Sequence, residues 1–368
     1  MKPLFHLTTV LALMSCQSNI TAPSIFHWQA PLTPQQQPVI GFGPYALGAG
    51  CLVQSDTNEV GFRDTDSGQL LWQHDLPPGW LNDVWILEEI DIDPTEVTLF
   101  GPDEAIVFNE QGHKRHITYP MTSNEWTTRM GARNDQHWLL PIYDGPTVRV
   151  MASDNDGFTW DSALVVLNDP AHYNIIDGLT VTDSAWYGTR RLWDANQQKG
   201  YTDVIICPHG GQASFYSVSQ DGGTGHPVKL SPAGITILTH HHMVQVSFSG
   251  NILWSVLLSE PATLASFELF NGSAYLLHQS GQLEVFDLSN GSSSQHHLGS
   301  TGMIDRITLG PNGPWVPWGR DVIDLAIVPQ SMKQARHLLG TSQLAHPIVP
   351  ASTGIVVRNH VYVYCAPD

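Results

Sequence analysis

Residues 60–77 read VGFRDTDSGQLLWQHDLP, and this stretch decides the fold class. An apolar run leads into a turn that starts at Asp64 and ends at Gly68, and a second apolar run containing Trp72 follows. Asp, Ser and Gly favour turns because their side chains bond the local backbone or, for Gly, allow positive φ. Two short apolar runs joined by such a turn predict a β-hairpin.

The hairpin recurs at a regular interval along the chain. Trp72 lies 44 residues after Trp28, and two further steps of the same length reach His116 and Trp160. Three of these four positions are therefore Trp, which indicates a repeat of one structural unit.

The same Gly-to-Trp spacing returns later, at Gly250 and Trp254, and weaker copies lie at 286–291 and 322–329. A period of roughly 40 to 50 residues built from strand-turn-strand units is typical of a β-propeller, whose four-stranded blades bury their faces against one another. The chain has 32 Gly and 25 Pro, and only 14% of its residues are charged. No long stretch has a helical period, so an all-β fold is favoured.

The number of blades follows from the length of the repeat array. The number of residues in 25–368, divided by a period of 44, gives about 7.8 units. We therefore expect eight four-stranded blades, with seven as the alternative. Blade four is the longest because of an insertion at 190–200. The expected blades are 38–80, 81–124, 125–168, 169–224, 225–260, 261–302, 303–342 and 346–368.

The last of these blades is too short to supply four strands itself. We expect residues 25–32, which contain Trp28, to add the missing strand and close the ring. Such a closure pairs strands that would otherwise present open edges.

The N-terminus is predicted to be a targeting segment and not part of the fold. Lys2 precedes an apolar run over 4–14, which is too short to cross a bilayer as a permanent helix. Leu13-Met14-Ser15-Cys16 resembles a bacterial lipobox, which implies that Cys16 is lipidated after cleavage. The alternative is an ordinary signal peptide with an incidental Cys.

Three segments follow from this interpretation. Residues 1–16 form the signal and lipobox segment, 17–24 form a tether, and 25–368 form a single propeller domain. In the lipoproteins that this segment resembles, Gln17 in place of Asp implies sorting to the outer membrane.

The remaining cysteines are Cys51, Cys207 and Cys365, an odd number for an exported chain. In the eight-blade layout the first and last blades are neighbours, so a disulfide between Cys51 and Cys365 could join them. Three buried free thiols are the alternative.

The net charge is −18, from 16 basic and 34 acidic residues. This balance argues against nucleic-acid binding and against direct adsorption to anionic lipid. Membrane attachment is therefore expected only through the N-terminal lipid.

The unit Asp64-x-x-x-Gly68-x-x-x-Trp72 resembles the repeat of the quinoprotein-like (PQQ-repeat-like) propellers. The resemblance implies that the Trp packs between adjacent blades. Among those propellers, the layout is similar to the non-catalytic, BamB-like lipoproteins of outer-membrane β-barrel assembly. Quinone-dependent members carry a vicinal Cys pair, and this chain has no adjacent cysteines, so we expect no cofactor.

A second motif, Ser153-x-Asn155-x-Gly157-x-Thr159-Trp160, resembles the Asp box of sialidases and related propellers, with Asn155 in place of the Asp. In that family the box is a structural hairpin away from the catalytic centre. The motif therefore implies a propeller and says little about activity.

A degenerate second copy of the box lies at Ser219-x-Asp221-x-Gly223. By resemblance, a sialidase would need three clustered arginines, a Tyr nucleophile assisted by Glu, and an Asp acid. No family motif identifies them here, so we assign no catalytic residue. The available side chains are Arg129, Arg133, Arg190, Arg191, Arg306 and Arg320 with Tyr143 or Tyr187.

Two further groups could bind metal ions. His240, His241 and His242 are consecutive, and on a strand only the first and third would share a face. Glu89, Asp91 and Asp93 would share a face of the inner strand of blade two, where they could bind calcium or form a solvated rim together with Glu88. We expect no metal site in either group.

Trp315 and Trp318 offer two interpretations, an exposed aromatic patch for a peptide or glycan, and packing between blades.

Taken together, the sequence predicts an exported, lipid-anchored, non-catalytic propeller that binds an envelope protein. It would lie at the periplasmic face of the outer membrane or at the cell surface. The alternative is an Asp-box glycan hydrolase or glycan-binding module.

Overall fold

The structure is a computed structural model of the chain. It describes residues 28–31, 45–56, 58–78, 92–93, 96–127, 131–168, 172–221, 228–262, 265–299, 307–310, 313–318, 321–338, 345–351, 354–358 and 362–367. Several residues considered above lie outside this set, namely Cys16, Glu88, Glu89, Asp91, Arg129, Gly223, Arg306 and Arg320. Within the described set, no helix has the length and apolar character needed to cross a membrane.

The described strands form eight antiparallel sheets. Seven sheets are each formed by consecutive strands and are numbered here in chain order. The first consists of β2 (Tyr45–Leu47), β3 (Gly50–Asp56), β4 (Glu59–Asp64) and β5 (Leu70–Asp75), and the second of β6 (Ile92–Asp93), β7 (Glu96–Phe100), β8 (Glu104–Asn109) and β9 (Lys114–Thr118). The third consists of β10 (Trp126–Thr127), β11 (Ala132–Arg133), β12 (Trp138–Asp144), β13 (Thr147–Ser153) and β14 (Asp161–Leu167), and the fourth of β15 (His172–Val181), β16 (Ala185–Asp194), β17 (Lys199–Pro208) and β18 (Ser214–Ser219).

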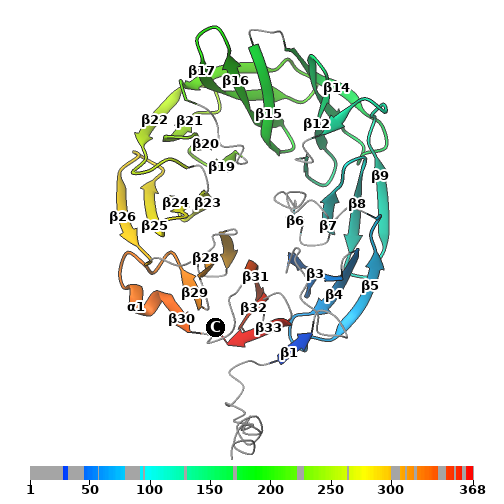
Figure 1. Ribbon diagram of the computed structural model, residues 1–368, viewed down its shortest axis with the longest axis vertical. Helices are drawn as coiled ribbons and strands as arrows, with labels where there is room; N and C mark the ends of the chain where they lie inside the picture. Colours follow the sequence, from blue (N-terminus) through cyan, green and yellow to red (C-terminus); the bar gives the residue numbers. More distant parts are fainter. Residues whose placement is uncertain are drawn as a thin grey trace, which may run out of the picture.

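The next three sheets comprise β19 (Lys229–Ser231), β20 (Gly234–Leu238), β21 (His242–Val246) and β22 (Ile252–Leu257); β23 (Ala265–Phe270), β24 (Ser273–His278), β25 (Gln282–Asp287) and β26 (Ser293–His297); and β27 (Thr308–Gly310), β28 (Gly313–Trp318), β29 (Asp321–Asp324) and β30 (Arg336–Leu338), with the short helix α1 (Met332–Ala335) before β30. Figure 1 shows the sheets arranged in a ring, with β19 and β23 toward the centre and β22 and β26 at the periphery. The fold is a β-propeller.

The remaining sheet joins the two ends of the described chain. It runs in the order β1 (Trp28–Pro31), β33 (Tyr362–Pro367), β32 (Gly354–Arg358) and β31 (Ala345–Ala351). β1 and β33 are antiparallel, with Trp28 opposite Cys365 and Pro31 opposite Tyr362. β31 also packs against β2, so this sheet neighbours the first complete one.

Burial differs between the middle and the peripheral strands of the sheets. β12 has the sequence WLLPIYD and is buried at all but its last residue, because both faces of its sheet are covered by neighbouring sheets. The peripheral strand β22 instead alternates between exposed and half-buried residues. The hydrophobic core therefore lies between sheets. One cluster, for example, joins Leu52 and Phe62 of one sheet to Leu99 and Phe108 of the next.

The turn between β4 and β5 is held by its own side chains. Oδ1 of Asp64 accepts hydrogen bonds from the Ser67 hydroxyl (2.6 Å) and backbone N–H (2.7 Å), and the hydrogen bonds from Ser67 lower the pKa of Asp64. The Gly68 N–H donates to the Asp64 carbonyl at 2.9 Å, which requires the positive φ of 73° that Gly adopts readily. Asp287 and Gly291 repeat this arrangement.

The repeat tryptophans lie between neighbouring sheets. The Trp72 ring stacks on Phe62 of its own sheet and on Phe108 of the next sheet. Trp254 donates its indole N–H to the Leu288 carbonyl at 3.0 Å, again in the next sheet.

Trp315 and Trp318 are both buried in β28, so the interpretation as an exposed aromatic patch is wrong. Trp318 belongs to a core cluster with Leu277 and Leu283 of the preceding sheet. Packing between sheets accounts for the Trp318 side chain.

The cysteines lie on middle strands. Cys51 is fully buried in β3, and Cys365 lies on β33 of the adjacent sheet. A disulfide between them stays a prediction. Cys207 is buried at the end of β17, and burial raises the pKa of its thiol.

Candidate functional site

Arg133, one of the arginines that a sialidase could use, is part of the packing between two sheets. Its guanidinium donates to Glu96 (2.6 Å) and to the Thr98 hydroxyl (2.7 Å), and only 4% of its side chain is exposed. It also lies over the Trp138 ring, 5.0 Å from the centroid. These partners belong to the second and third sheets, so Arg133 joins them.

Arg190 is occupied within the fourth sheet. It is directly opposite Asp203 in the β16–β17 register, forms an ion pair with it, and lies over the Phe215 ring. The β16–β17 hairpin includes the insertion predicted at 190–200.

The two tyrosines considered as nucleophiles are buried. The Tyr143 hydroxyl donates to the Ile176 carbonyl (2.7 Å) and accepts from the Ile176 N–H (3.2 Å), which joins β12 to the inner strand of the next sheet. Burial raises the pKa of Tyr187, and a hydrogen bond involving Thr182 acts in the opposite direction. Only 2% of Tyr143 and 6% of Tyr187 are exposed.

The turn between β13 and β14 contains the residues that resemble an Asp box. Asn155 accepts the Thr159 N–H (2.9 Å) and donates to the Thr159 hydroxyl (2.8 Å), while the Ser153 hydroxyl accepts the Gly157 N–H (3.0 Å). Trp160 packs against the core cluster of the second and third sheets. In this turn Asn155 makes the hydrogen bonds that organise the loop.

His240 and His241 lie in the turn between β20 and β21, so the three histidines do not share a strand as the sequence suggested. His242 begins β21, and its Nδ1 is 3.3 Å from Oδ2 of Asp221. The same carboxylate accepts the His241 N–H at 2.9 Å. Burial raises the pKa of Asp221, but hydrogen bonds from Ser219, His242 and neighbouring groups outweigh it and leave a lowered pKa.

An exposed apolar surface lies where the third and fourth sheets meet. Tyr173 and Trp193 are opposite each other in the β15–β16 register, and 47% and 49% of them are exposed. Leu167, at the end of β14, is 71% exposed, and its carbonyl accepts a hydrogen bond from Asn174, next to Tyr173. We call Leu167, Tyr173 and Trp193 the β14–β16 surface.

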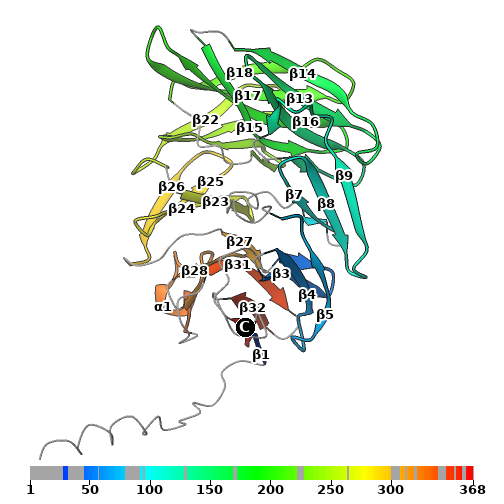
Figure 2. The ribbon, with the colours of Figure 1, turned by 45° about the vertical axis from the view of Figure 1, so that its right-hand side comes forward.

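The supporting strands include the longest that the structure describes. β15, β16 and β17 have ten residues each, and β15 packs against β11, β12 and β13 of the preceding sheet. Figure 2 shows these two sheets side by side. The β14–β16 surface is therefore carried by long strands that pack against the preceding sheet.

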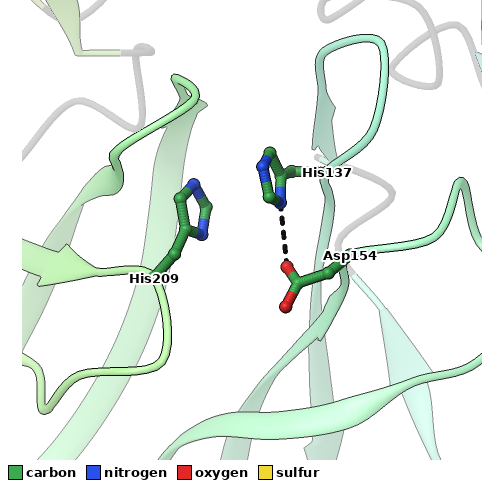
Figure 3. A group of neighbouring side chains, drawn as sticks. All are labelled: His137, Asp154 and His209. Atoms are coloured by element: carbon green, nitrogen blue, oxygen red, sulfur yellow. Dashed lines mark hydrogen bonds and ion pairs between the residues drawn. The ribbon is translucent and has the colours of Figure 1, made fainter.

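A second group combines His137, Asp154 and His209 (Figure 3). His137 immediately precedes β12, Asp154 follows β13, and His209 follows β17, so all three lie in turns. Nδ1 of His137 is 2.8 Å from Oδ1 of Asp154, and the two imidazole rings stack with centroids 3.9 Å apart and planes 12° apart. One donor atom from each residue lies within 4.8 Å of the others.

No spacing motif in the sequence predicts this group, because its members are far apart in the chain. The β11–β12, β13–β14 and β17–β18 turns each carry one of them. Aligning the blades and asking which turns lie at the same end of neighbouring sheets would have brought the three residues together.

Comparisons with known proteins support the fold. No protein-family model and no curated protein matches the chain. Among solved structures, a computationally designed protein, Ika8, is similar with a TM-score of 0.58 and 12% identity, over 89% of this chain and 99% of that chain. BamB from Moraxella catarrhalis is similar with a TM-score of 0.48 and 12% identity, over 74% of this chain and 77% of that chain. At such low identity the likeness concerns the fold alone.

Proposed function

We propose that this chain is a non-catalytic binding scaffold of the cell envelope, an eight-bladed propeller closed by its N-terminal strand and anchored through lipidated Cys16. The observation that carries the proposal is the β14–β16 surface, where large apolar side chains of the third and fourth sheets are exposed. Solvent-exposed apolar clusters on an otherwise soluble fold are typical of interaction sites.

The composition of this surface favours a protein partner. Tyr and Trp are enriched at the centres of protein interfaces because they bury a large area at a low cost in side-chain entropy. Leu167 adds an aliphatic group beside them, which suits a protein surface better than a sugar. A glycan would instead require polar groups directed at its hydroxyls.

The described arginines also support a scaffold over a hydrolase. Arg133 joins two sheets through Glu96, and Arg190 is paired with Asp203. Releasing either guanidinium would leave a largely buried group, Arg133 itself or Asp203, without its partner, which is costly. Neither arginine is therefore available to converge with others on an anionic substrate.

The membrane part of the proposal rests on the sequence. The segment ending in Leu13-Met14-Ser15-Cys16 supplies the lipidation site, and 17–24 supplies the tether. A net charge of −18 would repel the propeller from anionic lipid, so the lipid would hold the protein to the membrane while the ring faces the aqueous side.

Site-specific photocrosslinking in the native envelope tests both parts of the proposal. A photoreactive amino acid placed at Trp193 should capture one defined protein, whereas the same group at Leu257, which is 68% exposed in the fifth sheet, should not. The Cys16→Ala variant should leave the membrane fraction and lose the crosslink.

A double variant, Tyr173→Ala with Trp193→Ala, should reduce recovery of the captured protein at least tenfold while its thermal unfolding remains cooperative. Equal crosslinking from the two positions would refute the assignment of the surface. Binding to an array of sialosides and other glycans that depends on Trp193 would support the glycan-binding alternative instead.

A further inference from the structure

We propose that His137, Asp154 and His209 form a binding site for a divalent transition-metal ion of the zinc class. The site lies in turns where the third and fourth sheets meet, and it is independent of the scaffold function proposed above. The proposal rests on the donor atoms, on the hydrogen bonds behind them and on the way the turns are held together.

The donor set suits zinc chemically. Two imidazoles and one carboxylate are the ligands of many zinc sites with three protein donors, in which water takes the fourth position. Imidazole nitrogen also suits Cu²⁺ and Ni²⁺, whereas Mg²⁺ and Ca²⁺ prefer oxygen donors alone. The expected preference is therefore for zinc-like ions over the alkaline earths.

Hydrogen bonding leaves His209 with a nitrogen available for a metal. Nε2 of His209 is 2.7 Å from the Thr182 carbonyl, which only accepts hydrogen bonds, so Nε2 carries the proton. In the neutral ring, the lone pair is then on Nδ1. A histidine that donates one N–H to a backbone carbonyl and ligates through the other nitrogen is the usual arrangement in metal sites.

The other two donors already form a close pair. Nδ1 of His137 lies 2.8 Å from Oδ1 of Asp154, with a hydrogen bond between them. An ion would replace the hydrogen in this bond, and the proton of the neutral ring would move to Nε2 of His137. His137 is 15% exposed and Asp154 is 68% exposed, so an ion can reach the pair from solvent.

The turns that carry the ligands are fixed across the boundary between the sheets. Oδ1 of Asn134 accepts the His137 N–H (2.8 Å), and Nδ2 of Asn134 donates to Asp183 of the next sheet (3.1 Å). The His209 N–H donates to the Ser184 carbonyl (3.2 Å). These bonds fix the backbone of the turns that carry the two histidines.

Binding requires at least one histidine ring to turn out of the stack, because an imidazole nitrogen binds an ion in the plane of its ring and the two planes, 12° apart, do not meet at one ion. Zinc with tetrahedral bonds of about 2.0–2.1 Å separates neighbouring donors by about 3.4 Å, and the donor atoms lie within 4.8 Å of one another. Rotation of the three side chains closes this difference, and the exposed Asp154 is the least constrained of them. The acidic protein as a whole also raises the local concentration of cations.

The test uses the full chain without a histidine tag, stripped with a chelator and titrated with Zn²⁺ in competition with a chromophoric indicator. We expect each chain to bind one Zn²⁺ tightly and its Tm to rise on addition of Zn²⁺. His137→Ala and His209→Ala should each lower the affinity for this Zn²⁺ at least tenfold. Mg²⁺ should not compete for it.

Two control variants separate this site from other histidines. His116 lies 2.8 Å from Glu104 with no second histidine in the pair, so His116→Ala should leave the affinity unchanged. A variant with His240, His241 and His242 all replaced by Ala should also retain it. The proposal would be overturned if the wild-type chain binds no Zn²⁺ tightly. It would also be overturned if either control variant loses the tightly bound Zn²⁺ while His209→Ala retains it.

Discussion

The indole N–H of Trp72 donates to the backbone carbonyl of Glu110 at 2.8 Å, which joins the peripheral strand of one sheet to a turn of the next. The ring lies over Gly112 of the same turn, where an added Cβ would come within 2.9 Å of it. Trp254 and Gly291 have the same relationship, also at 2.9 Å. The Gly residues of the repeat thus serve the neighbouring sheet as well as their own turn.

Replacing Gly112 should destabilise the fold through two separable effects. Gly112 has φ of 79°, and Gly272 has φ of 77°, but a Cβ at Gly272 would have no neighbour within 4 Å. Gly272→Ala should therefore cost about 1–2 kcal/mol for the backbone conformation alone. Gly112→Ala should cost about 1–3 kcal/mol more, because the methyl group displaces Trp72.

Urea unfolding of both variants measures this difference. Equal free energies of unfolding for Gly112→Ala and Gly272→Ala would contradict the claim that the Trp ring requires a glycine beneath it.

Replacing Trp72 with Phe should isolate the hydrogen bond from the stacking. Phe retains an aromatic ring between Phe62 and Phe108 but cannot donate to Glu110, so we expect a loss of about 1 kcal/mol for the bond, with a smaller term for lost contact area. Trp193→Phe is the matched control, since half of this side chain is exposed, and it should change stability by less than about 0.5 kcal/mol. Equal losses in the two variants would show that the indole N–H of Trp72 contributes nothing.

The sequence contained the repeat because its determinants are local. Asp64, Gly68 and Trp72 lie within one hairpin, and the turn needs only side chains that bond their own backbone. The same residues specify the contact with the next sheet, so one short pattern encodes both the blade and its packing. The first seven predicted repeats accordingly each contain the strands of one sheet.

The sites depend on contacts that no local pattern records. Arg133 would look the same in sequence at an exposed rim as in its buried ion pair with Glu96, and the alternation rule could not show that His240 and His241 lie in a turn. His137 and His209 come together only because turns of neighbouring sheets meet at one end of the ring. Such information lies in the arrangement of the sheets and not in the spacing of residues.

The disulfide expected between Cys51 and Cys365 can be tested by peptide mapping of the chain purified under oxidising conditions. We expect a linked peptide pair that separates on reduction, and reduction should lower stability by about 2–4 kcal/mol because the bond would close a long loop. Cys207, which is buried with a raised thiol pKa, should react with an alkylating reagent only after denaturation. Recovery of Cys51 and Cys365 as separately alkylated peptides from the oxidised protein would contradict the prediction.

A buried pair in the sixth sheet predicts a loss of stability in acid. Only 1% of the Glu284 side chain and 2% of the His278 side chain are exposed, and Nε2 of His278 lies 2.8 Å from Oε1 of Glu284. Burial opposes ionisation of Glu284, but hydrogen bonds from His278 and from the Ser259 N–H and hydroxyl outweigh it and lower its pKa.

A carboxylate with a lowered folded-state pKa stabilises the fold fully above its ordinary pKa of 4.5, and this contribution disappears as the pH falls through the lower folded-state value. The free energy of unfolding should therefore decrease with falling pH in that window. In Glu284→Gln the decrease should be smaller, because the amide does not titrate there. Glu104→Gln, which removes a carboxylate from a less buried position, is the control. Identical pH profiles of the unfolding free energy for wild type and Glu284→Gln would refute the assignment of the acid-dependent loss of stability to Glu284.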